Sequence, residues 1–201
     1  VDREVDFEFI RKGLEMIPKL SFQLPAYIVS YPRSGSNFMQ MVLRKASGLN
    51  SLSFQSSDRV WQDMCLTMKS HSISPEYLKA ECERVMTLPR SPQKIILLLR
   101  DPRDIMISFY EYTKAVRKCH IEEVNFLEET DFFYAAKLDL GIYHSGKNVL
   151  QAFRKFVEKW YILPQIEFDL ITVRYEDLLN HSAREFRRIF DFLELNCEFK
   201  P

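Results

Sequence analysis

The chain has 201 residues, of which 46% are hydrophobic and 28% are charged, which favours one globular domain with a packed core and excludes an intrinsically disordered chain. Lys and Arg number 28 and so do Asp and Glu, so the formal net charge of zero provides no long-range field to attract a polyanion such as DNA. The longest aliphatic run, residues 95–99, is far shorter than the roughly 20 residues of a membrane-spanning helix, so we expect neither a nucleic-acid nor a membrane partner.

The first quarter of the chain predicts a helix, a strand and a second helix. Residues 7–17 carry apolar side chains at helical spacing, and Pro18 stops that run. Residues 26–29 are apolar and partly β-branched, which is typical of a buried strand. Residues 38–46 return to helical spacing, and Gly48 is suited to end that helix. The order is therefore strand, tight loop, helix.

The same order recurs twice further along. Residues 94–99 predict a buried strand, and Asp101 and Pro102 after it suit the N-cap and first position of a helix. Residues 170–173 predict another strand, and residues 182–185 match a capping box at the start of a final helix. Continuous apolar strands alternating with amphipathic helices predict an α/β fold with three layers, a mainly parallel central sheet with helices on both faces.

Ligands of such sheets bind beyond the carboxyl ends of the strands, where the loop of residues 30–37 is expected. This loop brings hydroxyl groups and Arg33 to a helix N-terminus, whose unpaired N–H groups and dipole favour an anion such as phosphate. The alternative is an ordinary turn that caps the helix. The loop lacks the second glycine and the lysine of a Walker motif, which disfavours an ATPase or a nucleotide kinase.

A second candidate feature, Lys69-Ser70-His71, follows a stretch at residues 65–68 that is long enough for a strand. The imidazole of His71 is a candidate base, although a lone histidine after a strand is more often structural. The four histidines show no ligand spacing with cysteines or carboxylates, so we expect no metal.

The order of four motifs resembles that of the sulfotransferases that use 3′-phosphoadenosine-5′-phosphosulfate (PAPS) and release 3′-phosphoadenosine 5′-phosphate (PAP). The resemblance runs from Tyr27 to Leu195. The motifs are Pro-Arg-Ser-Gly at 32–35, Lys-Ser-His at 69–71, Leu-Arg-Asp-Pro-Arg-Asp at 99–104 with Ser-Phe-Tyr at 108–110, and Arg-Tyr-Glu-Asp-Leu at 174–178. The resemblance implies a P-loop-NTPase-like sulfotransferase fold in one domain, residues 1–201. It also implies transfer of a sulfuryl group from PAPS to a hydroxyl of a small molecule.

The resemblance further implies roles for individual residues. His71 is expected to act as the base, Arg33 to stabilise the leaving 5′-phosphate where most members have Lys, and Lys69 to face the same group. The expected donor-binding residues are Arg33, Ser34, Gly35, Ser36 and Asn37 at the 5′-phosphosulfate, Phe38 and Tyr175 beside the adenine, and Arg100 and Ser108 at the 3′-phosphate.

Other interpretations of three of these residues stay open. Lys69 is alternatively a surface lysine, Phe38 a core residue of its helix, and Tyr175 ordinary packing at a strand end. The aromatic-rich residues 117–161 are expected to build a pocket for an apolar or aromatic acceptor, with a carbohydrate acceptor as the alternative. Part of that segment, Phe153, Val157 and Trp160, alternatively forms the buried stripe of a helix.

The chain departs from the family pattern near its end. The given sequence ends at Pro201, soon after Tyr175, so we expect it to lack the Arg-Lys-Gly loop that closes over the 3′-phosphate in cytosolic-type members, and their dimerisation segment. Either Arg100 and Ser108 hold the 3′-phosphate with other local help, or the sequence is a fragment, or the donor binds weakly. The alternatives to an active enzyme are a PAP-binding module that has lost turnover and, less favoured, a metal-dependent kinase. The oligomeric state stays open.

The compartment is predicted from the cysteines and the first residues. Cys65, Cys82, Cys119 and Cys197 show no C-x-x-C spacing, and a domain of this size needs no disulfides. Residues 1–10 are acidic and amphipathic, unlike a secretory signal. We therefore expect reduced thiols and a cytoplasmic location.

Overall fold

The computed structural model describes residues 25–49, 51–53, 66–85, 94–118, 149–162 and 168–195. Several predictions lie outside these residues, namely the opening helix at 7–17, the thiols of Cys65, Cys119 and Cys197, and most of the aromatic segment 117–161. Within the described ranges, no helix has both the length and the apolar character required to cross a bilayer.

Five parallel strands form one sheet in the order β2-β3-β1-β4-β5. Strand β1 is central, with Val29 opposite Ser70 of β3 on one side and Leu97 of β4 on the other. The three strands predicted outright are confirmed as β1, β4 and β5. The strands are β1 (Ala26–Ser30), β2 (Ser51–Ser53), β3 (Thr67–Ser70), β4 (Lys94–Leu99) and β5 (Asp169–Arg174).

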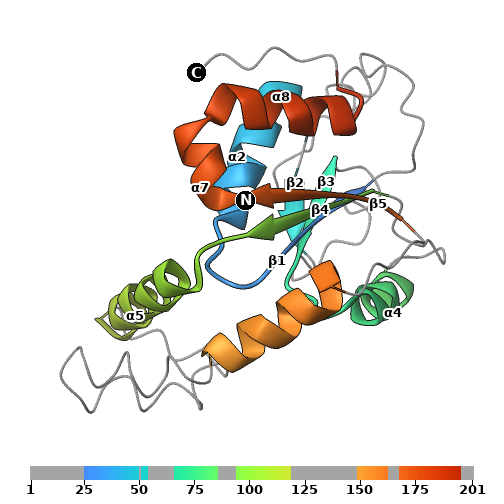
Figure 1. Ribbon diagram of the computed structural model, residues 1–201. Coiled ribbons are helices and arrows are strands. Elements are labelled where there is room, and N and C mark those ends of the chain that lie inside the picture. Colours follow the sequence, from blue (N-terminus) through green and yellow to red (C-terminus); the bar gives the residue numbers. More distant parts are fainter. Residues whose placement is uncertain are drawn as a thin grey trace, which may run out of the picture.

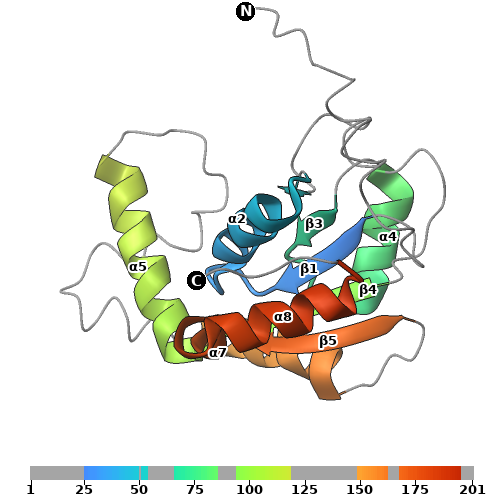
Figure 2. The same cartoon turned by 90° about the horizontal axis from the view of Figure 1, so that it is seen from above.

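Helices cover both faces of the sheet, which confirms the predicted three layers (Figure 1). Helices α2, α7 and α8 lie on one face, and α4 and the helical residues 149–162 lie on the other. Helix α5 extends beyond the carboxyl end of β4, away from the sheet, in both views (Figure 2). The helices are α2 (Ser36–Ser47), α4 (Pro75–Val85), α5 (Pro102–Lys118), α7 (Tyr175–Asn180), α8 (Ser182–Phe192) and the π-helix η2 (Glu158–Ile162) that ends the 149–162 segment.

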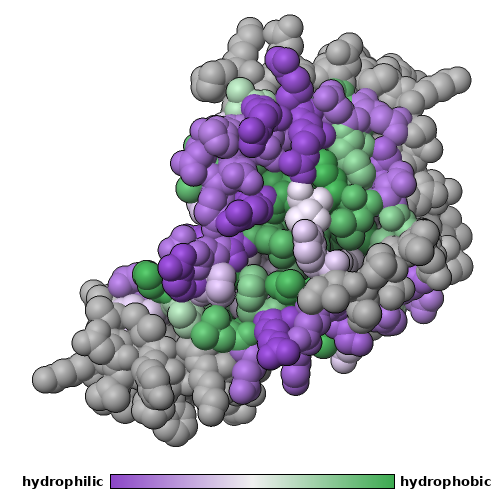
Figure 3. All heavy atoms as spheres, in the orientation of Figure 1, coloured by the Kyte–Doolittle hydropathy of each residue, from purple (hydrophilic) through white to green (hydrophobic). Residues whose placement is uncertain are grey.

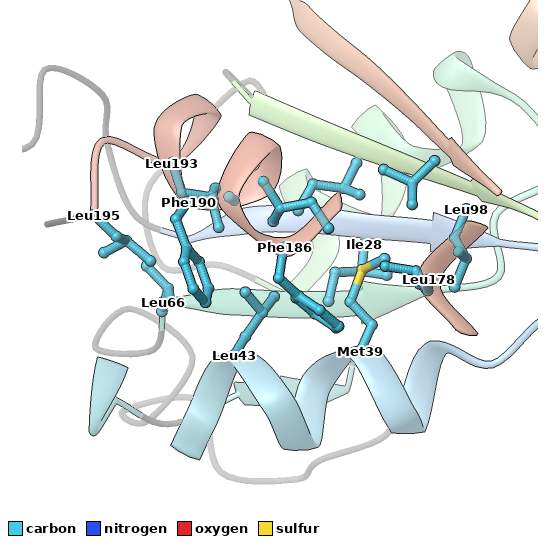
Figure 4. Close-up of a cluster of buried hydrophobic side chains, with 14 of the residues drawn as sticks. Ile28, Met39, Leu43, Leu66, Leu98, Leu178, Phe186, Phe190, Leu193 and Leu195 are labelled. Atoms are coloured by element: carbon cyan, nitrogen blue, oxygen red, sulfur yellow. The ribbon is translucent and has the colours of Figure 1, made fainter. Parts of the chain in front are cut away.

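Alternation along the buried strands creates two hydrophobic cores. In β1, Ile28 faces the core under α2 and α8, while Tyr27 and Val29 face the core under α4. Figure 4 shows the first core, in which Met39 of α2 and Phe186 of α8 converge on Ile28. The outer faces of α7 and α8 are hydrophilic, and hydrophobic side chains gather over the sheet beneath them (Figure 3).

The second core contains the one cysteine that the structure describes and part of the predicted acceptor wall. Cys82 is a free, buried thiol, and burial raises its pKa to about 11. Trp160 is buried in this core and Val157 packs against it. These two residues therefore follow the alternative interpretation, in which they form the buried stripe of a helix.

Of the three helix-end predictions that fall on described residues, two are confirmed and one is wrong. Asp101 caps α5, since its Oδ1 accepts a hydrogen bond from the backbone N–H of Arg103 at 2.9 Å. Gly48 ends α2 in the left-handed region with φ 72°. Ser182 does not cap α8, because its hydroxyl instead donates to the carbonyl of Leu178 at 2.6 Å. Helix α7 lies immediately before α8, so a carbonyl of its last turn is the nearer partner.

Candidate functional site

Three loops meet at the carboxyl edge of the sheet. Arg100, after β4, donates from Nη1 to the carbonyl oxygen of Arg33, after β1, at 2.9 Å. Arg33 in turn donates from Nε to Ser108 Oγ of α5 at 3.2 Å. The backbone N–H of Asp101 donates to Glu176 Oε1 of α7 at 2.7 Å, which joins the third loop to the second. The sequence-predicted residues Arg33, Arg100 and Ser108 are thus brought together.

The loop between β1 and α2 is turned by two left-handed residues. Arg33 has φ 67° and Gly35 has φ 92°, and the Ser34 N–H donates to the Tyr31 carbonyl at 3.3 Å. Helix α2 therefore begins directly beyond the strand, and the N–H groups of its first turn lack partners within the helix. The Ser34 hydroxyl is fully buried and has no hydrogen-bond partner among the described residues. A helix start with a buried, unsatisfied hydroxyl beside it is suited to receive an anion.

Tyr175 lies directly over this loop. Its ring fills the space where a Cβ on Gly35 would be. The guanidinium of Arg100 stacks on the same ring at 4.6 Å from the centroid, and Phe38 contacts it edge-on at 6.3 Å. Phe38 also packs against Phe186 of the first core, as its alternative interpretation expects. Tyr175 and Phe38 thus form an aromatic corner beside Gly35.

Gly35→Ala is expected to destabilise the protein by about 2–5 kcal/mol. A left-handed backbone costs an L-residue about 1–2 kcal/mol, and displacing the Tyr175 ring adds about 1–3 kcal/mol of overpacking. The matched control is Gly48→Ala, where φ is 72° but nothing lies within 4 Å of an added Cβ, so only the backbone cost remains. Urea unfolding of both variants measures the difference. Equal losses of stability would show that the Tyr175 ring moves aside without a loss of packing energy.

Arg33 is directed toward α5. Its guanidinium lies 4.5 Å from the ring centroid of Tyr112, in addition to its bond with Ser108. Desolvation lowers the pKa of Arg33, the nearby Tyr112 raises it, and the positive charge of Arg100 lowers it further. The cation expected at the 5′-phosphate therefore contacts a residue expected at the 3′-phosphate. The sequence did not indicate Tyr112 as a site residue, because only the fold brings it to Arg33.

His71 and Lys69 stand at the end of β3, on the other side of β1. His71 Nδ1 lies 2.8 Å from the carbonyl oxygen of Ser30. Since a carbonyl only accepts, Nδ1 carries the hydrogen, and the neutral imidazole keeps its lone pair on Nε2. Lys69 Nζ donates to Asn37 Oδ1 of α2 at 2.7 Å. Two residues of the Lys-Ser-His motif thus touch the end of β1 and the start of α2.

The surroundings of His71 favour its neutral form. The residue retains solvent access, but neighbouring protein atoms desolvate the ring, and this desolvation is the main cause that lowers its pKa. The bond to Ser30 opposes that effect, the positive charge of Lys69 adds to it, and the negative charge of Glu81 opposes it. Burial also lowers the pKa of Lys69. An imidazole with a lowered pKa is unprotonated near neutral pH and is able to accept a proton.

Within the described part of the chain, no cluster of three or more His, Cys, Asp and Glu side chains is arranged to hold a metal. Arg33, Lys69 and Arg100 bring positive charge to this edge. Fixed cations and backbone N–H groups are the groups that proteins use to bind phosphate and sulfate esters.

Comparison with known proteins identifies the family of this chain. A family model described as a sulfotransferase domain matches residues 25–200. A flavonol 3-sulfotransferase of Flaveria bidentis is 22% identical in an alignment 189 residues long, which covers 83% of this chain and 55% of that protein. This chain therefore spans about half the length of that relative.

Two solved structures share the fold. A mouse sulfotransferase complexed with PAP aligns with a TM-score of 0.56 and 16% identity over 94% of this chain and 64% of its own. A sulfotransferase from Alicyclobacillus acidocaldarius aligns with a TM-score of 0.53 and 11% identity over 90% of this chain and 85% of its own. At these identities the likeness concerns the fold alone, and it confirms the predicted sulfotransferase fold.

Proposed function

Because the chain belongs to the sulfotransferase family, we propose that it transfers a sulfuryl group from PAPS to a hydroxyl group of a small acceptor, within one domain. The observation that carries this proposal is the convergence of Arg33, Arg100 and Ser108 on one edge, beside the unsatisfied Ser34 hydroxyl. A doubly phosphorylated nucleotide requires two such groups of donors, one at each phosphate.

The first group of donors suits the 5′-phosphosulfate. A buried polar atom without a partner costs about 1–3 kcal/mol, so the Ser34 hydroxyl gains by bonding an ester oxygen. Ser36 and Asn37 occupy the first turn of α2, where free N–H groups and the helix dipole add to the attraction. Gly35 lies at the N-cap of α2, and because it has no Cβ the Tyr175 ring packs directly against this loop.

The second group suits the 3′-phosphate. Arg100 Nε is buried and has no hydrogen-bond partner in the described ranges, while its Nη1 is fixed on the Arg33 carbonyl. A guanidinium held in this way keeps a donor available for a phosphate oxygen, and Ser108 supplies a hydroxyl beside it. Tyr175 and Phe38 offer aromatic surface for the adenine between the two groups.

His71 is the proposed base. Its Nε2 takes the proton of the acceptor hydroxyl as the acceptor oxygen forms a bond to sulfur and the bond between sulfur and the 5′-phosphate oxygen breaks. Lys69 and Arg33 stabilise the negative charge that develops on the leaving phosphate. Lys69 is suited to this task because Asn37 holds its ammonium group at the start of α2.

We propose a small apolar or aromatic acceptor, with a carbohydrate as the alternative. The support is the aromatic composition of residues 117–161 together with Phe153, whose ring meets that of Tyr31 edge-on at 5.6 Å next to the β1 loop. Aromatic walls at such a site bind apolar rings by burying their surface.

The second candidate function is a PAP-binding module without turnover. The contact of Arg33 with Ser108 favours it, since that contact directs the cation away from His71.

PAP is expected to raise the melting temperature of the protein, whereas ATP with magnesium is not. At a hundred times its dissociation constant a ligand adds about 2.7 kcal/mol, which corresponds to roughly 5–10 °C for a chain of this size. A thermal-shift series followed by transfer of radiolabelled sulfate from PAPS to a panel of phenols, alcohols and sugars tests both steps. A shift without transfer supports the binding module. Absence of a shift with PAP would refute both functions.

A further inference from the structure

We propose that Glu81 is a positioning residue for His71, because its carboxylate holds the two serines that flank His71 in the sequence. This inference rests on the proposed function, in which His71 is the base. Nothing in the sequence pattern or the family resemblance points to Glu81, which lies on α4, outside the four motifs.

The contacts of Glu81 reach both sides of His71. Ser70 Oγ donates to Glu81 Oε2 at 2.9 Å, and Ser72 Oγ donates to the same oxygen. The two hydroxyl oxygens lie 2.6 Å apart, and the Ser72 N–H donates to Ser70 Oγ at 3.0 Å. Ser70 is 3% exposed and Ser72 is 5% exposed, so water cannot readily replace these bonds. One carboxylate therefore fixes the backbone before and after His71.

A second element holds the same segment. Trp160 donates from Nε1 to the carbonyl oxygen of Ser72 at 2.9 Å, and its ring is buried in the second core. The segment is thus fixed by α4 through Glu81 and by η2 through Trp160, while His71 Nδ1 reaches across to Ser30. Networks of fully paired, buried polar groups are rigid, since each bond restricts the others.

Capping of α4 does not explain these contacts. The N-terminus of α4 is already served by Ser74, whose carbonyl accepts from the Leu78 N–H at 3.1 Å and whose hydroxyl accepts from the Tyr77 N–H at 3.4 Å. The carboxylate of Glu81 instead accepts hydrogen bonds from Ser70 and Ser72, on either side of His71. The network therefore links α4, through Glu81, to the segment that carries the candidate base. A residue placed in this way can hold the base in position without touching the reacting atoms.

The position of this segment decides which nitrogen of His71 is free. The bond from Nδ1 to the Ser30 carbonyl keeps the hydrogen on Nδ1 and the lone pair on Nε2. A displacement of the segment would break this bond, and the two tautomers would then exchange. Glu81 also adds charge, because its carboxylate raises the pKa of His71 against the effects of burial and of Lys69. The carboxylate thereby stabilises the imidazolium that forms when His71 takes a proton.

Glu81→Ala is expected to lower kcat by roughly 10- to 100-fold, as a displaced catalytic group does, with KM for PAPS unchanged. The matched control is Glu83→Ala on the same helix, whose side chain is exposed and which should keep full activity. Nitrogen NMR of the imidazoles provides a readout that needs no turnover. We expect the Nδ1–H tautomer for His71 in the wild-type protein and in Glu83→Ala, and its loss in Glu81→Ala. Unchanged kcat and tautomer in a folded Glu81→Ala would overturn the inference.

Two milder variants keep the inference testable if Glu81→Ala does not fold. Glu81→Gln retains an acceptor oxygen but no charge, so the tautomer should persist, the pKa of His71 should fall, and the acidic limb of kcat/KM should move to lower pH. Ser72→Ala removes one bond and should weaken the Nδ1–H signal. If neither variant alters the tautomer or the pH profile, the inference is wrong. If the wild-type protein transfers no sulfate, the proposed function fails, whereas the tautomer still decides whether Glu81 positions His71.

Discussion

His71→Ala is expected to lower kcat for sulfuryl transfer by roughly 10²- to 10⁴-fold, the range typical of losing a general base. Affinity for PAP should stay close to that of the wild-type protein. The reason is that His71 contacts Ser30 at the end of β1, whereas the cations beside the proposed phosphate sites keep their partners. The contact between Lys69 and Asn37 also survives the substitution.

Initial rates with PAPS and calorimetric titration with PAP measure the two effects separately. The matched control is His181→Ala, which removes an exposed imidazole between α7 and α8. The pH dependence provides a further check. Because desolvation lowers the pKa of His71 from its ordinary value of 6.5, the acidic limb of kcat/KM should have its midpoint below 6.5 in the wild-type protein and be lost in the variant. Full turnover by His71→Ala would assign the base to another residue.

Several strands and helices of this fold were predictable because they carry a local signal. Strand β4 is a continuous apolar run, and α5 starts with an aspartate cap followed by proline. Strand β2, Ser51–Ser53, was missed because three residues with one apolar side chain carry no period. The order of strands was also beyond a local pattern, since β1 lies between β3 and β4 through pairings that are distant in sequence.

The failed capping prediction at Ser182 has a different cause. The local sequence is that of a capping box, but the preceding residues already form a helix, and its carbonyl at Leu178 takes the hydroxyl. Glu185, the expected partner in the box, is buried and paired with Arg184 at 3.0 Å and Arg188 at 2.7 Å. Whether a capping-box sequence forms its hydrogen bonds therefore depends on the neighbouring groups in the fold, which the local sequence does not reveal.

The candidate site divides in the same way. The motif resemblance pointed to Arg33, His71 and Arg100, and the fold brings their loops to one sheet edge. It did not point to Glu81, which bonds Ser70 beside His71, or to Tyr112, whose ring lies against Arg33. The residues proposed to contact the donor lie in recognisable motifs, whereas Glu81 and Tyr112 reach the site through the packing of other helices and have no fixed spacing from those motifs.

Arg100→Ala is expected to weaken PAP binding by roughly 10²- to 10³-fold. Each hydrogen bond to a charged group contributes about 1.5–3 kcal/mol, and Arg100 has a buried Nε without a partner and an Nη1 that fixes the loop through Arg33. Arg100→Lys should recover little of this loss, because an ammonium group cannot reproduce the planar fork that bonds the loop and stacks on Tyr175. The matched control is Arg103→Ala, whose side chain is 81% exposed and pairs with Asp101 alone among the described residues. An exposed pair of this kind contributes little.

Comparing two nucleotides assigns the effect of Arg100 to one phosphate. PAP and adenosine 5′-monophosphate differ by the 3′-phosphate, so removing either that phosphate or the Arg100 side chain deletes the same proposed contact. If the contact exists, Arg100→Ala strongly weakens the binding of PAP and weakens that of the monophosphate little. The variant then binds the two nucleotides with similar affinity. If Arg100 acts only by holding the Arg33 carbonyl, the affinities for both nucleotides fall by the same factor, because the displaced loop belongs to the proposed 5′-phosphate site. Calorimetry of the four combinations separates these outcomes, and equal losses would remove Arg100 from the 3′-phosphate site.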